Sequence, residues 1–99
     1  MISDKNLRKI AELLRKADQC SDEYDAYAEC IWELFTMTYR DALSQLVNCG
    51  PVEDGNVISK SYRDELITLG LAGRVVVKGQ QGFTGANYDG WAVYKAGQK

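Results

Sequence analysis

The chain has 99 residues, 45% of them hydrophobic, and a formal net charge of -2. This length and composition suit a single domain whose core is large enough to fold without metal or disulfide support. The near-neutral charge excludes a general attraction to nucleic acid or anionic membranes, and no apolar run approaches the roughly 20 residues that span a bilayer.

Cysteine and histidine usage narrows the chemistry further. Cys20, Cys30 and Cys49 form no CxxC pair, and the chain contains no histidine. Structural zinc sites draw on both residue types, and an odd number of cysteines does not make a disulfide scaffold. We therefore expect no metal, no cofactor and a reducing, cytoplasmic compartment. The N-terminus turns polar at Ser3 and has no signal-peptide core.

The first predicted helix runs from about Asp4 to Cys20. Ser3 is a suitable N-cap, and the charge of Asp4 favours the positive end of the helix. The apolar residues of this segment share one face, which predicts an amphipathic helix docked on the rest of the domain. They are Leu7, Ile10, Leu13, Leu14 and Ala17.

A second helical pattern runs from about Asp22 to Asn48 and is stopped by Gly50 and Pro51. A helix this long either bends near Thr36 or forms a straight spine, and we favour the spine. Its first half carries five acidic residues and no basic one: Asp22, Glu23, Asp25, Glu29 and Glu33. Its aromatic residues are Tyr24, Tyr27, Trp32, Phe35 and Tyr39. This aromatic content predicts a homodimer through this helix or the first one.

The second half begins with a turn-rich connection and then a helix from about Ser59 to Leu69. Ser61 and Asp64 have capping-box spacing, and Gly70 ends the helix. Strands are predicted at Arg74–Lys78 and Trp91–Lys95, joined by a wide loop rich in glycine and amide side chains. The expected fold class is α+β in a single domain, with a helical hairpin over residues 1–50 and a helix-plus-hairpin half over residues 51–99.

The run Ser59-Lys60-Ser61-Tyr62-Arg63-Asp64-Glu65-Leu66, followed by Leu69-Gly70-Leu71-Ala72, resembles winged helix-turn-helix domains. Together with Cys49-Gly50-Pro51-Val52, it is also similar to small uncharacterised proteins of phages and prophages in proteobacteria. The resemblance implies a recognition helix and a wing that contact duplex DNA. It implies nucleic-acid contacts by Lys60, Ser61, Arg63 and Thr68 on the helix, and by Lys78, Gln80, Gln81, Thr84 and Asn87 on the wing. The connection 51–57 is too short for the first helix of a standard helix-turn-helix.

Enzyme chemistry is not expected. Without histidine the commonest general base is missing, and no GxSxG, P-loop or dinucleotide fingerprint occurs. The glycines Gly79, Gly82 and Gly85 are spaced differently from a phosphate-binding loop and lie between two predicted strands.

Two functions remain open, a DNA-binding regulator and a small protein-binding inhibitor or adaptor. Residues 59–99 hold six basic and three acidic residues, a net charge of +3, but Asp64 and Glu65 would repel phosphate. The order of the elements favours DNA, which we place narrowly first. The sparse basic residues favour a host protein as partner, bound through the wing and the acidic helix face.

Overall fold

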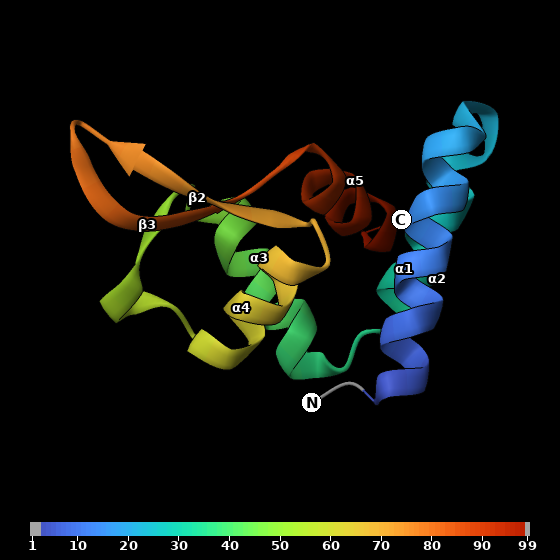
Figure 1. Ribbon diagram of the computed structural model, residues 1–99, viewed down its shortest axis with the longest axis horizontal. Coiled ribbons are helices and arrows are strands. Elements are labelled where there is room, and N and C mark those ends of the chain that lie inside the picture. Colours follow the sequence, from blue (N-terminus) through green and yellow to red (C-terminus); the bar gives the residue numbers. More distant parts are fainter. Residues whose placement is uncertain (1–2, 99) are drawn as a thin grey trace.

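The computed structural model describes residues 3–98, with the backbone alone at Ser21. Within these residues, five α-helices and a three-stranded antiparallel sheet form a mixed α+β fold about 37 Å long (Figure 1). The helices are α1 (Asp4–Gln19), α2 (Tyr24–Leu34), α3 (Met37–Asn48), α4 (Lys60–Thr68) and α5 (Tyr88–Gly97). The strands are β1 (Val52–Glu53), β2 (Ala72–Val77) and β3 (Gln80–Ala86), and 3₁₀ turns lie at η1 (Ser21–Glu23) and η2 (Asp54–Asn56). The two expected halves, 1–50 and 51–99, also include residues 1, 2 and 99, which lie outside the described residues.

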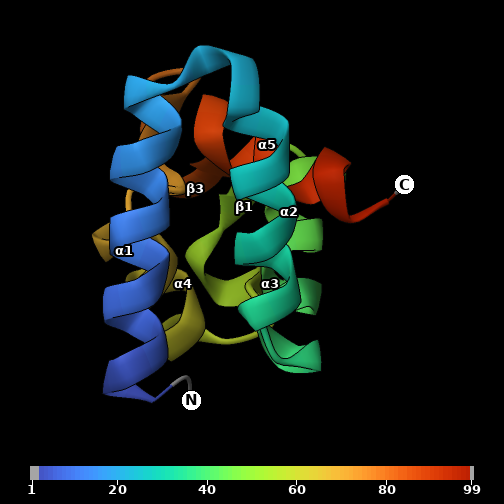
Figure 2. The same ribbon diagram turned by 90° about the vertical axis from the view of Figure 1, so that its right-hand side faces the viewer.

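The first helix agrees with its prediction. The Ser3 side chain accepts a hydrogen bond from the backbone N–H of Asn6 at 3.3 Å, as an N-cap does. On the apolar face Ile10 and Ala17 are buried, and α1 lies alongside α2 (Figure 2). The amphipathic stripe is therefore docked within the chain.

The long spine helix predicted over residues 22–48 is wrong. The helix breaks at Phe35, whose backbone is extended, and restarts with Thr36 as the N-cap of α3. The Thr36 side chain accepts from the N–H of Tyr39 at 3.4 Å. Arg40 holds the break from the α3 side, because its Nε donates to the Trp32 carbonyl at 3.2 Å and its guanidinium lies over the Trp32 ring. A local cap thus interrupts a hydrophobic pattern that continues across it.

The first strand of the hairpin lies where it was predicted, and the second strand lies at a different position. Strand β2 overlaps the predicted strand, but the chain turns back at once through Lys78 and Gly79, both at positive φ, into β3. Two consecutive residues at positive φ are typical of a tight two-residue hairpin turn. The predicted wide loop is therefore largely strand, and β3 is the central strand of the order β1-β3-β2.

The strand predicted at Trp91–Lys95 is wrong, because these residues belong to helix α5. Asn87 caps α5 by accepting from the N–H of Gly90 at 2.9 Å. Gly90 and Gly97 let α5 approach its neighbours closely: a Cβ on Gly90 would overlap the Leu71 carbonyl, and one on Gly97 would overlap the Trp32 ring. Helix α5 is therefore packed closely against both α2 and Leu71, the residue just before β2.

The core joins the two halves of the chain. Leu43 of α3, Leu66 of α4, Leu71 before β2 and Val93 of α5 are all at most 1% exposed and belong to one cluster. Ser59, rather than the predicted Ser61, caps α4 and accepts from the N–H of Tyr62 at 3.3 Å. Across the described residues, no helix combines the length and apolarity needed to cross a membrane.

Candidate functional site

We give the name wing face to the exposed side of α4 together with the β2–β3 hairpin as far as its turn and the first residues of β3. In Figure 1 the hairpin extends away from the helices, toward the end of the molecule opposite α1 and α2. The structure leaves six of the nine sequence-predicted contact residues exposed on this face: Lys60, Ser61, Thr68, Lys78, Gln80 and Gln81.

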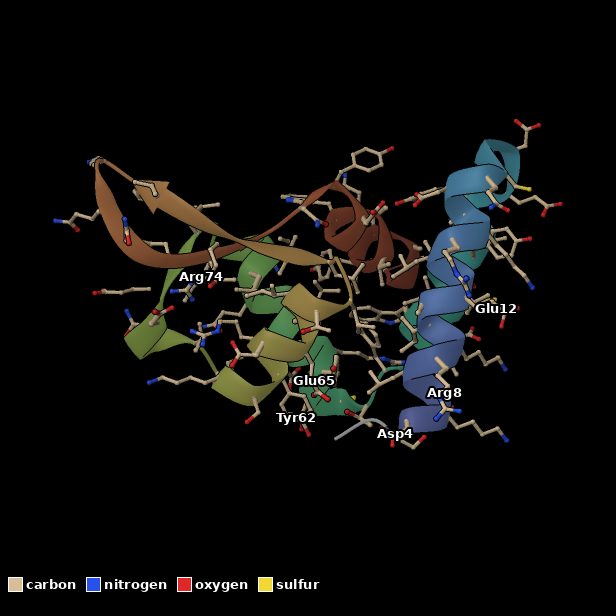
Figure 3. All side chains as sticks on the ribbon, viewed as in Figure 1. Asp4, Arg8, Glu12, Tyr62, Glu65 and Arg74 are labelled. Atoms are coloured by element: carbon tan, nitrogen blue, oxygen red, sulfur yellow. The ribbon has the colours of Figure 1, made fainter. Side chains whose placement is uncertain are left out.

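Two arginines and one carboxylate form an ion-paired cluster between α4 and the hairpin. Arg74 of β2 donates through Nη1 and Nη2 to Oδ1 and Oδ2 of Asp54, at 2.7 and 2.8 Å. Arg63 of α4 donates through Nη1 to the same Oδ1 at 2.8 Å and also pairs with Asp64. Figure 3 shows Arg74 directed from β2 toward the segment that contains η2. The Arg63 side chain is only 12% exposed, so this predicted nucleic-acid contact is already engaged within the chain.

The cluster changes the acidity of its carboxylate. Hydrogen bonds from Arg74 lower the pKa of Asp54, partial burial opposes this effect, and the charges of Arg74, Arg63 and Lys60 add to it. The carboxylate is therefore held in its charged form. Asp54 ties the segment after β1 to both α4 and the hairpin.

Two of the predicted wing contacts have structural positions instead. Thr84 is 0% exposed and accepts from Nη1 of Arg74 at 3.1 Å. The side chain of Asn87 caps α5 and also donates to the Gly70 carbonyl at 2.6 Å. The expectation that Thr84 contacts a ligand is therefore incompatible with its burial, and both polar ends of the Asn87 amide are already bonded.

A second candidate surface, which the sequence did not predict, lies between α2 and α5. It is a cleft of about 530 Å³, and we call it the aromatic cleft. Its lining residues are Tyr24 and Asp25 from α2, and Tyr88, Trp91, Ala92, Lys95 and Ala96 from α5. Tyr88 is 79% exposed and Trp91 41% exposed. Large aromatic rings left open to solvent on a small domain mark a candidate interaction site.

Two polar contacts organise the walls of the aromatic cleft. The Tyr24 hydroxyl donates to Oδ1 of Asp89, and its ring centroid lies 6.0 Å from that of Tyr88. Burial, then the hydrogen bond to Asp89, raises the pKa of Tyr24 well above its usual range. Within the α5 wall, Nζ of Lys95 lies 5.4 Å from the centroid of the Trp91 ring, within cation–π range.

A third polar feature is buried below α4, where Figure 3 labels Tyr62 and Glu65. The Tyr39 hydroxyl and Oε2 of Glu65 are buried, and neither makes a hydrogen bond of normal geometry within the described residues. The two groups still interact electrostatically, since burial first and Glu65 second raise the pKa of Tyr39. The rings of Tyr62 and Phe35 pack on Tyr39 at 4.8 and 4.9 Å between centroids. This pair belongs to the packing of α3 against α4.

The sequence contains a signal that could have located helix α5, which forms one wall of the aromatic cleft. Asn87 followed by Asp89 and Gly90 is a typical helix start, and Tyr88, Trp91 and Lys95 then recur at helical spacing. Assigning Trp91–Lys95 to a strand hid this pattern. In residues 3–98 no group of three or more metal-ligating side chains is placed to hold a metal ion.

Comparisons of the chain with protein-family models, with curated proteins and with solved structures return no match.

Proposed function

We propose that this protein is a non-enzymatic protein-binding module built on a winged-helix-like scaffold. The observation that carries the proposal is the engagement of Arg63 and Arg74 by Asp54. Proteins that bind duplex DNA tightly neutralise several phosphates with lysine and arginine. Here two of the four cations of the helix and hairpin are paired inside the chain, and Lys60 and Lys78 are the exposed pair that remains.

The charge of the whole winged-helix-like half supports the same view. Residues 51–99 contain six basic and five acidic residues, so their net formal charge is only +1. The count of +3 over residues 59–99 omitted Glu53 and Asp54, which precede α4. Because Asp54 lies within hydrogen-bond distance of both arginines, its negative charge offsets positive charge that would otherwise attract a phosphate.

A winged-helix-like DNA-binding regulator is the second candidate, and the order of elements favours it. Helix α4, the turn at Gly70, β2, a tight turn and β3 follow one another as a recognition helix and wing do. The position of the first helix of a standard helix-turn-helix is taken by the short turn η2. This shortening removes the element that normally braces the recognition helix on the DNA backbone.

A gel shift with random duplex, run beside an affinity pull-down from a bacterial lysate, separates the two candidates. We expect no shift at about 50 mM salt, where attraction to phosphates is strong, and a stoichiometric protein partner that stays bound as salt rises. A salt-sensitive shift that Lys60→Ala and Lys78→Ala each weaken, without a protein partner, would contradict the proposal.

The Asp54→Asn variant sharpens this experiment. If neutralisation by Asp54 is the reason that duplex is ignored, releasing Arg74 should create salt-sensitive duplex binding, with a logarithmic salt slope steeper by about 1, because Asp64 still pairs with Arg63. The matched control is Asp41→Asn on α3, which removes one negative charge away from the cluster. Binding gained equally by both variants would point to net charge alone.

The predicted homodimer has lost part of its original argument. Of the five aromatic residues that motivated it, Trp32, Phe35 and Tyr39 are 9, 4 and 0% exposed within one chain, and Tyr24 and Tyr27 are partly exposed. It stays a prediction. A cytoplasmic location is also part of the proposal, supported by the free, exposed thiols of Cys20, Cys30 and Cys49, which persist in reducing compartments.

A further inference from the structure

The α5 side of the aromatic cleft is a helical stripe open to solvent. Tyr88, Trp91, Ala92, Lys95 and Ala96 follow the spacing i, i+3, i+4, i+7, i+8 on one face of the helix. Such a face is normally covered by a neighbouring element, yet its two largest rings remain 79% and 41% exposed. The cleft volume of about 530 Å³ lies within the roughly 300–1,000 Å³ of pockets that hold ligands.

The charges around the aromatic cleft favour a cation. Asp25 lines the cleft, Asp89 accepts from the Tyr24 hydroxyl, and Asp18 is near enough to act electrostatically on that hydroxyl. Lys95 is the basic residue of the lining. The faces of the aromatic rings add further negative potential. A phosphate or carboxylate ligand would meet repulsion here, whereas a cation would be attracted.

The position of Lys95 indicates how a cation can lie in the cleft. Its ammonium already sits 5.4 Å from the Trp91 centroid, so the chain itself places a positive group over this ring. The more exposed ring of Tyr88 stands beside Tyr24, at 55° to it. A guanidinium is planar and weakly hydrated, so it can stack on such a ring while donating paired hydrogen bonds to a carboxylate.

From this geometry we infer that the aromatic cleft binds an arginine-bearing segment of a partner protein. The guanidinium stacks on Tyr88 or Trp91 and pairs with the carboxylate of Asp25, and an apolar residue beside the arginine covers the half-buried Ala92. The inference rests on the proposed function, since it names the surface and the chemistry through which that function acts. Acidic clefts with exposed aromatic rings complement arginine better than any anionic ligand.

The test is an NMR titration of the full chain with three capped tripeptides. The central residue is arginine, its neutral isostere citrulline, or glutamate, and each is flanked by leucines. We expect the arginine peptide to shift the Trp91 indole and the Tyr88 and Ala92 amides with a dissociation constant of about 1 mM. The citrulline peptide should bind several-fold more weakly, and the glutamate peptide should not bind.

Variants tie the binding to the cleft. Trp91→Ala should weaken arginine-peptide binding by about tenfold or more, because exposed aromatic anchors dominate such contacts. Asp25→Asn should weaken it by about threefold, in keeping with a solvent-exposed ion pair. The matched controls are Val76→Ala, which removes an exposed apolar side chain from β2, and Asp41→Asn on α3. Both should bind as the wild type does, and thermal unfolding of each variant establishes that it is folded.

If a ligand of another kind occupies the aromatic cleft, the titrations give a different result, and that result overturns the inference. Equal binding of the arginine and citrulline peptides would mean an apolar surface without preference for a cation. Tighter binding of adenosine monophosphate would mean a nucleotide site. Shifts at Trp91 that grow with protein concentration alone would mean that a second copy fills the cleft, for example through Arg8 or Arg15 of α1. No shift of the Trp91 indole with about 10 mM arginine peptide, tenfold above the expected dissociation constant, would also overturn it.

The outcome is separate from that of the proposed function. A protein partner captured equally well by wild type and by Trp91→Ala would support a protein-binding module and reject this cleft as its surface. Duplex binding at the wing face, together with arginine-peptide binding at the aromatic cleft, would reject the protein-binding module and support the cleft as an arginine site.

Discussion

The wing face and the aromatic cleft differ in what they leave unpartnered within the chain. The arginines of the wing face are ion-paired, whereas the large aromatic rings of the cleft are exposed. At the wing face, both arginines are already paired. Arg74 donates to both carboxylate oxygens of Asp54, and Arg63 donates to one of them and is mostly buried. At the cleft, the rings of Tyr88 and Trp91 remain exposed. A surface that has satisfied its own charges gains little by binding, because a ligand must replace bonds that exist. A surface with uncovered apolar area gains by being covered.

These differences indicate different roles for the two regions. Both contain acidic and basic side chains, with Asp54 and Arg74 at the wing and Asp25 and Lys95 at the cleft. In the wing region the contacts fix the hairpin against α4. In the cleft region they hold the walls in place and leave the centre open.

The largest expected effect tests whether α5 is a rigid wall of the cleft. Gly90→Ala would drive a Cβ into the Leu71 carbonyl, and backbone cannot move aside as a flexible side chain can. We expect the free energy of unfolding to fall by about 3 kcal/mol, as in overpacked cores, despite the better helix propensity of alanine. Urea unfolding measures it.

Gly55→Ala is the matched control, since a Cβ at Gly55 of η2 meets nothing within 4 Å. Its free energy of unfolding should stay within about 0.5 kcal/mol of the wild type. Equal stability of the two variants would mean that α5 does not pack on Leu71 as described, and the cleft would lose its wall.

An element can be predicted from the sequence when the residues that determine it lie within the element itself. Helices α1 and α4 and strand β2 were predicted because their caps, periods and β-branched residues act locally. Strand β3 was missed because Gln80–Ala86 is rich in glycine and amide side chains. It is a strand because it pairs on both edges, with Thr84 opposite both Val52 and Arg74. Such pairing cannot be read from one segment.

The candidate sites show the same limit. Lys60 and Lys78, two of the predicted nucleic-acid contacts, are exposed, and their contact with nucleic acid stays a prediction. The pairing of Arg63 and Arg74 with Asp54 was not foreseeable, since the partners are 9 and 20 residues apart in sequence. The aromatic cleft depends in turn on α5 packing beside α2, which no local pattern in the chain indicates.

The second prediction tests the satisfied charges at the wing. The pKa of Asp54 is lowered in the folded protein, so its pairing stabilises the fold above the unfolded pKa of about 3.9. This contribution is lost as the pH falls through the lower folded value. An NMR titration should show the Asp54 carboxyl and the Arg74 Nε–H changing together, with a midpoint below about 3.9.

In Asp54→Asn the Arg74 signal should no longer titrate in this range, because the carboxylate it reports is gone. A wild-type midpoint at or above about 3.9 would show that the pairing does not persist in solution. The wing would then have free arginines, and the contrast with the cleft would disappear.

The smallest expected effect tests the open centre of the cleft. Lys95 places its ammonium over Trp91 and adds a positive charge beside any incoming arginine. Lys95→Gln removes both the competing cation–π contact and the like charge. Exposed cation–π contacts contribute about 0.5–1 kcal/mol, so we expect the arginine peptide to bind about two- to fivefold more tightly. The NMR titration at the Trp91 indole measures this change, and Lys78→Gln at the hairpin turn is the control for net charge. A loss of affinity in Lys95→Gln alone would mean that Lys95 contacts the ligand directly, which an arginine segment does not require and an acidic one does.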